Sequence, residues 1–299
     1  MTAEKIWTVL DLLRWTTDHF RDRGVESPRL DAECLLAYAL GCDRLRLYID
    51  YEKPVEETER GRFRDLVKAR AGERIPMAYL SGQREFWSMP FVVNPSVLVP
   101  RPETECLVEA ALPRLGPGSR VLELGTGCGA ITVALAKEHP EAAFWATDLS
   151  ADALAVAQKN AQTLVPDVAI RWVAGDLFAA LGGERFDLIV SNPPYVAERD
   201  RPILAPELSH EPELALFGGP DGTEVLRRII AASPAHLLPG AALLLELDPR
   251  QAEALRRHGS ELGFDPAAPI RDAAGNERAI LLSFPADGRA PQPDPLESS

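Results

Sequence analysis

The residues best able to do chemistry form a short motif of Asn192, Pro193, Pro194 and Tyr195. They follow the apolar run 186–190, which predicts a buried parallel strand ending at the motif, where open α/β sheets bind ligands. The side-chain carbonyl of Asn192 and the backbone carbonyl of Pro193 can accept both hydrogens of a flat NH2 group, and the Tyr195 ring can stack on its face. A simple Asn-Pro turn is the alternative interpretation.

A glycine-rich turn earlier in the chain favours the ligand-binding interpretation. The predicted strand 121–124 runs into Gly125, Gly127 and Gly129, and a helix over 131–137 follows. Glycines at alternate positions let the backbone approach a ligand where a Cβ atom would collide. A dinucleotide-binding turn would place its third glycine one position after Gly129, so the spacing argues against a nicotinamide cofactor.

Acidic residues follow the next predicted strands. Asp148 comes after strand 143–147, where a carboxylate can accept both hydroxyls of a ribose. Asp176 and Leu177 come after strand 168–173, where Asp176 can accept from an adenine amino group and Leu177 can pack on the purine. Each acid can instead cap the helix that follows it. Because such features follow successive strands, we expect one shared site.

Strands and helices alternate from about residue 118 onward. The predicted strands are 121–124, 143–147, 168–173, 186–190 and 242–247, and two closing strands, from residue 264 and over 279–284, pair antiparallel through Gly275 and Asn276. This pattern predicts an α/β fold with a mostly parallel seven-stranded sheet that helices cover on both faces.

The rest of the chain divides by composition. The predicted parts are a small helical domain at 1–73, a linker at 74–102 with a short β-hairpin around 88–90, the α/β domain at 103–285 and a disordered tail at 286–299. Apolar residues recur at helical spacing in the first part, prolines interrupt the second, and the tail is rich in proline, serine and charge. Trp7, Trp15 and Tyr38 are expected in the helical core.

The charge and composition of the 299 residues exclude several kinds of function. A net charge of −13 at pH 7 opposes nonspecific binding to nucleic acid. The sequence has neither an apolar run of membrane-spanning length nor a signal peptide, so we expect a cytoplasmic protein without a membrane partner. Cys34, Cys42, Cys106 and Cys128 lack the spacing of metal ligands, so neither a metal site nor a disulfide is expected.

Together these motifs resemble the class I S-adenosylmethionine-dependent methyltransferases that methylate amino groups. The resemblance rests on Glu-Leu-Gly-Thr-Gly-Cys-Gly at 123–129, the aspartate after the second strand, and Asn-Pro-Pro-Tyr. Residues 79–82, 99–105, 211–212 and 218–222 are further similar to the peptide chain release factor glutamine N5-methyltransferases, and that likeness covers roughly residues 5 to 284. Asp248 departs from the family, which usually has glycine there, so the likeness does not fix the turn at this position.

The resemblance implies transfer of a methyl group from S-adenosyl-L-methionine to the glutamine side-chain amide in the Gly-Gly-Gln motif of bacterial release factors. It implies cofactor contacts from Glu123, Gly125, Thr126, Gly127, Cys128, Gly129, Asp148, Asp176, Leu177 and Asn192. Asn192, Pro193 and Tyr195 then act as catalytic residues that hold the amide, and Pro194 and Arg101 join them in binding substrate. Catalysis rests mainly on placement, because no side chain here is basic enough to deprotonate an amide.

Three alternatives stay open at this point. A glutamine methyltransferase acting on a ribosomal protein would share the chemistry, although segments 79–82 and 101–105 favour release factors. A nucleic-acid adenine methyltransferase is disfavoured by the net charge and by the lack of a basic recognition segment. A non-catalytic adenosylmethionine-binding module would not need the intact motif. A monomer is favoured, and the preferred release factor is not predicted.

Overall fold

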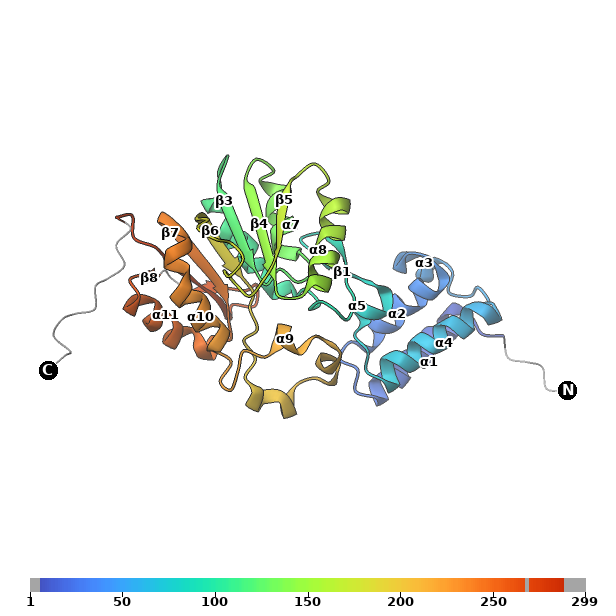
Figure 1. Ribbon diagram of the computed structural model, residues 1–299. Coiled ribbons are helices and arrows are strands. Elements are labelled where there is room, and N and C mark those ends of the chain that lie inside the picture. The colour runs from blue at the N-terminus through green and yellow to red at the C-terminus, as the bar shows by residue number, and fades with distance from the viewer. Residues whose placement is uncertain (1–5, 267–268, 288–299) are drawn as a thin grey trace. The chain divides into compact units, whose positions relative to one another are not determined.

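The computed structural model describes residues 6–266 and 269–287 (Figure 1). Within these residues the chain forms two compact units. One contains the residues up to Gln83 together with Ala205–His210, and the other contains Arg84–Leu204 and the residues from Glu211 onward. All but two residues of the predicted tail, 286–299, lie outside the described residues.

The first unit is helical, but it extends past the predicted boundary at residue 73 to Gln83, and its last helix, α5, lies in the predicted linker. Its helices are α1 (Val9–Asp22), α2 (Pro28–Leu40), α3 (Arg44–Ile49), α4 (Glu57–Gly72) and α5 (Met77–Ser81). Helix α1 begins at a capping box in which the Thr8 side chain accepts from Asp11 N and the Asp11 side chain accepts from Thr8 N. Helix α2 begins with Pro28 and ends at Gly41, whose φ of 63° is the left-handed conformation that glycine adopts without strain.

The expectation that Trp15 and Tyr38 belong to the core is wrong. Their relative exposures are 51% and 54%, whereas Trp7 is partly buried and packs against the core cluster of this unit. The buried positions of α1 follow the helical spacing of Val9, Leu12, Leu13, Thr16, Thr17 and Phe20, and Trp15 falls outside that stripe. Trp15 instead stacks on His19 with ring centroids 5.0 Å apart.

The segment Ala205–His210 joins the helical unit through charged contacts. Glu207 accepts from Arg70 Nη1 at 2.7 Å and pairs with Arg74 Nη2 at 2.6 Å. Arg70 is buried, and its Nε atom donates to Asp31 Oδ2 at 2.7 Å. The two carboxylates therefore compensate a buried guanidinium that would otherwise be costly to desolvate.

The second unit is built around one sheet. Its strands are β3 (Arg120–Leu124), β4 (Ala143–Asp148), β5 (Ile170–Ala174), β6 (Phe186–Ser191), β7 (Leu237–Glu246), β8 (Asp265–Pro266), β9 (Ile270–Arg271) and β10 (Glu277–Ser283). The order is β5-β4-β3-β6-β7-β10-β8, with β9 also paired to β10. Neighbours from β5 to β7 run parallel, and β10 is antiparallel to β7, β8 and β9. The sheet has eight strands, not seven, because β8 and β9 both pair with β10 at different positions.

Helices and 3-10 turns connect these strands. They are η1 (Pro102–Thr104), α6 (Glu105–Ala111), η2 (Leu112–Arg114), α7 (Ala130–Glu138), α8 (Ala151–Leu164), η3 (Glu198–Ile203), α9 (Glu213–Leu216), α10 (Glu224–Ala232), η5 (Ser233–His236), η6 (Pro249–Gln251) and α11 (Ala252–Glu261), and η4 (Pro206–His210) lies in the first unit (Figure 1). Helices α10 and α11 share a core cluster with alternate sheet residues such as Leu122, Ile189 and Leu243. Val121 and Leu188, which alternate with these residues, are also buried, as expected for a sheet covered on both faces.

A hairpin of β1 (Gln83–Phe86) and β2 (Met89–Val92) occupies the region where the sequence predicts one. Its turn is at Trp87 and Ser88, with φ values of 52° and 54°, so Met89 and Pro90 lie in the strand and not in the turn. The buried Asn160 of α8 holds β2 in place: its Oδ1 accepts from Val92 N at 2.8 Å, and its Nδ2 donates to Val92 O and to Cys128 O. One side chain thus connects the hairpin with the glycine turn.

Candidate active site

A pocket of about 410 Å3 opens at the carboxyl ends of β3, β4, β5 and β6. Parallel strands bring their carboxyl ends to one edge of a sheet, so residues far apart in sequence meet there. The lining includes Glu123, Gly125, Thr126, Gly127, Cys128, Asp148, Asp176, Leu177, Asn192 and Pro194, all of which the sequence singled out. Its volume lies within the range of small-molecule sites.

The glycine turn has the backbone conformation that its composition demands. Gly125, Gly127 and Gly129 have φ values of 68°, 55° and 84°, a region that residues with a Cβ atom avoid. At Gly129, an added Cβ would also lie 3.1 Å from the Cβ of Ala157 in α8. Gly129 itself is not among the pocket residues, and its role is to let α7 start close to α8.

Glu123 supports this turn from the end of β3. Its buried carboxylate accepts from Thr126 Oγ1 at 2.6 Å, from Thr132 N at 3.0 Å and from the Thr132 hydroxyl. Burial raises the pKa of Glu123 to about 7, although these donors favour the ionised form. Burial also raises the pKa of the neighbouring Cys128 to about 12, so its thiol is neutral.

Asp148 lies in the pocket and is not the cap of the next helix. Its Oδ2 accepts from Gly127 N at 2.8 Å and its Oδ1 from Ser150 N at 2.9 Å. Ser150 caps α8 instead, with its Oγ accepting from Ala153 N at 3.1 Å. The carboxylate is therefore held by backbone donors and keeps further lone pairs for a ligand hydroxyl.

Asp176 and Leu177 follow β5 and both line the pocket. Asp176 is half-exposed and accepts from Arg228 Nη2 at 2.6 Å. Leu177 has a φ of 50°, a left-handed conformation that strains a residue with a Cβ atom by about 1 to 3 kcal/mol. Its side chain packs against the core cluster, which stabilises this conformation and presents an apolar wall.

The Asn-Pro-Pro-Tyr motif contributes to the pocket through some of its residues. Asn192 and Pro194 line it, and Asn192 Nδ2 donates to Thr104 Oγ1 at 3.1 Å. Pro193 is buried, and the Tyr195 hydroxyl donates to Glu246 Oε1 at 3.0 Å. Within the described residues, the lining does not include Pro193 or Tyr195, so their contacts with substrate stay predictions.

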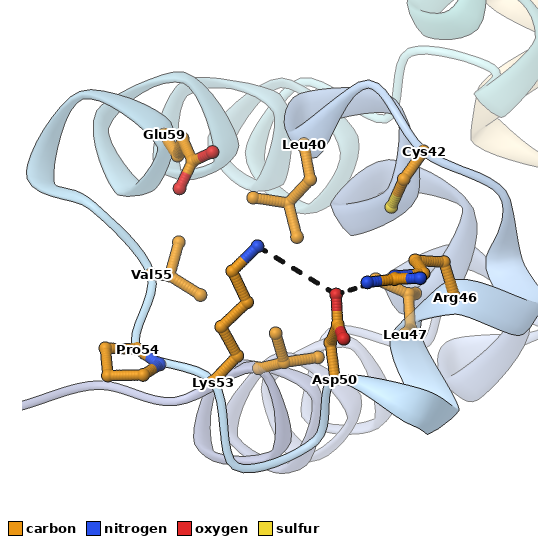
Figure 2. A pocket seen from close by; sticks show the side chains of 10 residues that line it. Leu40, Cys42, Arg46, Leu47, Asp50, Lys53, Pro54, Val55 and Glu59 are labelled. Atoms are coloured by element: carbon orange, nitrogen blue, oxygen red, sulfur yellow. Dashed lines mark hydrogen bonds and ion pairs between the residues drawn. The ribbon is translucent and has the colours of Figure 1, made fainter.

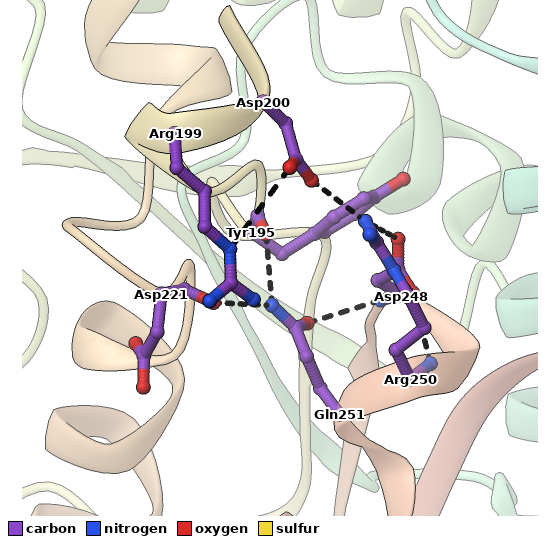
Figure 3. A network of polar contacts seen from close by, with 7 residues as sticks. All are labelled: Tyr195, Arg199, Asp200, Asp221, Asp248, Arg250 and Gln251. Carbon is purple, nitrogen blue, oxygen red and sulfur yellow. Dashed lines mark hydrogen bonds and ion pairs between the residues drawn. The ribbon is translucent and has the colours of Figure 1, made fainter.

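A polar network holds the backbone after the motif (Figure 3). Gln251 Nε2 donates to Tyr195 O at 2.9 Å and to Asp221 O at 3.3 Å, and Gln251 Oε1 accepts from Asp248 N at 3.1 Å. Asp248, where the resemblance implies glycine, has φ −73° and ψ 135°, which any residue can adopt. Its side chain caps η6 and pairs with Arg250, which also reaches Asp200.

Arg101 contacts a buried carboxylate and is absent from the lining formed by the described residues. Its Nη2 donates to Glu211 Oε1 at 2.5 Å, and Glu211 Oε2 accepts from Val99 N at 3.1 Å. This pair connects two segments that supply lining residues, among them Pro100 and Pro212. The predicted contact of Arg101 with substrate stays a prediction.

Sequence reasoning missed three residues around the motif. Thr104 lines the pocket and accepts from Asn192, and Asn160 holds the turn. Glu246 is 1% exposed at the end of β7. A carboxylate between Leu245 and Leu247, in an otherwise apolar strand, was a signal that could have identified Glu246.

The helical unit contains a smaller cavity of about 150 Å3 (Figure 2). Arg46 and Lys53 point toward Asp50 there, with ion-pair distances of 2.9 Å and 3.9 Å. Its volume is below that of typical ligand sites, and its lining contains none of the predicted site residues, so the pocket at the strand ends is the candidate site. Across residues 6–266 and 269–287, no cluster of side chains suits a metal ion, and no helix combines the length and hydropathy needed to cross a bilayer.

Known proteins match the chain over almost its whole length. Residues 11–82 match the PrmC N-terminal domain, and residues 102–247 match the methyltransferase small domain. A methyltransferase structure from Pyrococcus furiosus has a TM-score of 0.51 at 21% identity, covering 65% of this chain and 88% of that one. With the sheet order, this likeness confirms the predicted class I methyltransferase fold.

Curated relatives are more similar in sequence. The release factor glutamine methyltransferase of Geobacter sulfurreducens is 43% identical over 277 residues, which cover 92% of this chain and 96% of that protein. The release factor glutamine methyltransferase of Rhodopirellula baltica is 43% identical over 285 residues, with the same coverage of 92% and 96%. Similarity of this extent includes both the helical unit and the pocket, and it follows that the chain belongs to the release factor glutamine methyltransferase family.

Proposed function

We propose that this protein transfers a methyl group from S-adenosyl-L-methionine to the side-chain amide nitrogen of the glutamine in the Gly-Gly-Gln motif of bacterial release factors. The observation that carries the proposal is the pocket itself, which combines a glycine turn and Asp148 with Asn192. The first two are suited to the donor and the third to a carboxamide. The relatives named for this activity support the choice of substrate.

The residues of the pocket fit S-adenosylmethionine. Asp148 offers a carboxylate to the ribose hydroxyls, Leu177 offers an apolar surface to the purine, and the turn at 125–129 allows close approach of the backbone. Glu123 is held by Thr126 and Thr132 and keeps this turn in place. When bound, S-adenosylmethionine supplies an electrophilic methyl group on a positively charged sulfur atom.

The chain's own residues act by placing the amide. The Asn192 Oδ1 atom and the Pro193 carbonyl accept the two N–H groups of the glutamine side chain, and the Tyr195 ring supports its plane. The amide nitrogen is a weak nucleophile because its lone pair is delocalised, and no side chain in this site is a base strong enough to deprotonate it. Orientation of the lone pair is therefore the main contribution that these residues make to the rate.

We infer that the helical unit takes part in docking the release factor in the cytoplasm. Its exposed aromatic and apolar side chains, including Trp15 and Tyr38, offer a contact surface. The net charge of −13 favours a basic protein partner over nucleic acid.

A labelling experiment tests the proposed function. The purified protein is incubated with methyl-labelled S-adenosylmethionine and, separately, with release factor, ribosomal protein and DNA. We expect label on the release factor, in the peptide that contains Gly-Gly-Gln. Label on ribosomal protein or DNA alone would contradict the proposal. A short Gly-Gly-Gln peptide run in parallel measures how much recognition the rest of the release factor adds.

A further inference from the structure

A buried carboxylate, Glu246, lies at the strand end next to the one that carries Asn192. Glu246 is the last residue of β7 and is 1% exposed. Strands β6 and β7 are parallel, with Ser191 paired to Leu245, so Asn192 and Glu246 leave the two strands side by side. The proposed chemistry gives Glu246 no role, although burying a carboxylate is costly unless it is paired or hydrogen-bonded.

Two hydroxyl groups lie beside Glu246, and one of them, that of Thr104, also contacts the Asn192 amide. Asn192 Nδ2 donates to Thr104 Oγ1 at 3.1 Å, and the Thr104 hydroxyl lies close enough to Glu246 to favour its ionised form. The Tyr195 hydroxyl donates to Glu246 Oε1 at 3.0 Å. The other oxygen, Oε2, is buried without a hydrogen-bond partner among the described residues. Thr104 is itself only 3% exposed, yet it borders the pocket.

Because a hydroxyl has a single proton, Thr104 can donate to only one of its two neighbours at a time. A threonine hydroxyl has one proton and two lone pairs, and a carboxylate can only accept. When Glu246 is ionised, the Thr104 hydroxyl can turn its proton toward Oε2, which has no other hydrogen-bond partner among the described residues, and a lone pair remains for Asn192. Only the Nδ2 end of Asn192 can then face Thr104, so Oδ1 faces the pocket. When Glu246 is protonated, Thr104 can accept from it and donate to Asn192, and the amide can reverse.

We propose that Glu246 is a positioning residue that sets, through Thr104, which end of the Asn192 amide faces the substrate. The proposal rests on the proposed function, in which Asn192 accepts from a glutamine NH2 group. A reversed Asn192 would present its own NH2 group to that of the substrate, and two donors cannot satisfy each other.

The surroundings of Glu246 bring its ionisation into the neutral range. Burial raises its pKa to about 7, the hydroxyls of Thr104 and Tyr195 and the charge of Arg278 oppose the rise, and Glu103 adds to it. The titratable and charged groups that face it are Glu103 on η1, Cys106 on α6, Tyr195 after β6 and Arg278 on β10, which in turn pairs with Asp272. The orientation of Asn192 should therefore respond to pH near neutrality.

The first test follows the Asn192 side-chain amide by nitrogen-15 NMR in the full chain without substrate. We expect its NH2 resonances to shift with pH around a midpoint near 7, the midpoint of Glu246. The shift should vanish in Glu246→Gln and in Thr104→Val, which replaces the hydroxyl with a methyl group of similar size, and it should persist in Thr104→Ser. An Asn192 resonance that does not titrate, or that titrates normally in Thr104→Val, would overturn the proposal even if Glu246→Gln failed to fold.

The second test is kinetic and separates this inference from the proposed function. With release factor as substrate, kcat/KM of the wild type should rise as the pH passes about 7. Glu246→Gln should lower it about 10- to 100-fold and remove the step, since a small misplacement of a positioning group has effects of this size. Its affinity for S-adenosylhomocysteine should stay within about 2-fold of wild type, as expected for a loss confined to amide placement.

The outcomes of the two tests are distinct. Wild-type protein that does not methylate glutamine, but whose Asn192 titrates as expected, would contradict the proposed function and not the link through Thr104. Wild-type protein that methylates release factor without a step near pH 7, and equally fast as Glu246→Gln, would contradict the positioning role and leave the function intact.

Discussion

Asn192 and Asp148 line the same pocket, but their contacts differ, so we predict that they bind different ligands. Asp148 is held by Gly127 N and Ser150 N at the glycine turn, whereas Asn192 contacts Thr104. We expect Asn192→Ala to lower kcat by about 100-fold or more while donor affinity changes little, because it removes an acceptor for the reacting amide. Asp148→Ala should chiefly weaken donor binding. Calorimetric titration with S-adenosylhomocysteine, combined with steady-state kinetics, measures both effects.

Near-normal turnover by Asn192→Ala would contradict the amide-receptor assignment. Equal loss of donor affinity in the two variants would show that the pocket does not separate the two ligands as its contacts suggest.

Glu123 gives a prediction about stability and pH. Burial raises its pKa from 4.5 in the unfolded chain to about 7 in the fold. A raised acid pKa stabilises the fold below the lower value, and this stabilisation is lost as pH rises through the upper one. The free energy of unfolding of wild type relative to Glu123→Gln should therefore fall between pH 4.5 and about 7, by at most about 1.4 kcal/mol per pH unit. Urea titrations at several pH values measure it, and parallel curves for the two proteins would contradict it.

At the scale of single residues, the sequence predicts site residues that lie at strand ends, but not the contacts between residues far apart in the chain. Gly125, Asp148 and Asn192 could be identified because a parallel sheet collects the ends of successive strands at one edge. The contact of Asn192 with Thr104 joins residues 88 positions apart and depends on how η1 packs, which no local pattern encodes. The pairing of Arg101 with Glu211, 110 positions apart, is of the same kind.

The connection after the motif shows how elements hold the site. At Gly222, with φ 78°, an added Cβ would lie 2.2 Å from Tyr195 O and 2.7 Å from Gln251 Nε2. Gly240 has a φ of 80° but no atom within 4 Å of the same position. Gly240→Ala should therefore show the backbone strain alone, about 1 to 2 kcal/mol.

We expect Gly222→Ala to lose about 3 kcal/mol or more, because it must also displace the Tyr195 carbonyl from Gln251. Chemical denaturation of both variants measures the difference. Equal losses of unfolding free energy in the two variants would mean that displacing the Tyr195 carbonyl from Gln251 does not destabilise the fold.

Element boundaries were predictable where patterns are long and regular. Helix α8 spans Ala151–Leu164, the length of its amphipathic run, and strands β3, β4 and β6 match the predicted bounds to within one residue. Strand β5 begins two residues after the predicted start at 168, and β7 begins five residues before the predicted start at 242. Short elements in proline-rich stretches, such as α5 and α9, carry too few residues to show a period. In helix α1 the helical period was visible in the sequence, but Trp15 was still predicted in the core although it lies outside the buried stripe.

The charge of the whole molecule predicts how it meets its substrate. We expect the net charge of −13 to attract a basic docking surface on the substrate protein, and salt screens such an attraction. The association rate, measured by stopped-flow fluorescence, should fall about 10-fold or more between low and physiological salt. An association rate that does not respond to ionic strength would contradict electrostatic steering and would leave the proposed methyl transfer unaffected.

The segment Ala205–His210 has a consequence for any attempt to separate the two units. A fragment starting at residue 84 would retain every lining residue of the pocket, yet it would lack both arginines that compensate Glu207. Glu207, left without its two arginine partners, lies a few positions before Pro212, which lines the pocket. Truncation would thus alter the catalytic fragment itself, and reduced activity after removing the helices would report this local loss as well as any loss of docking.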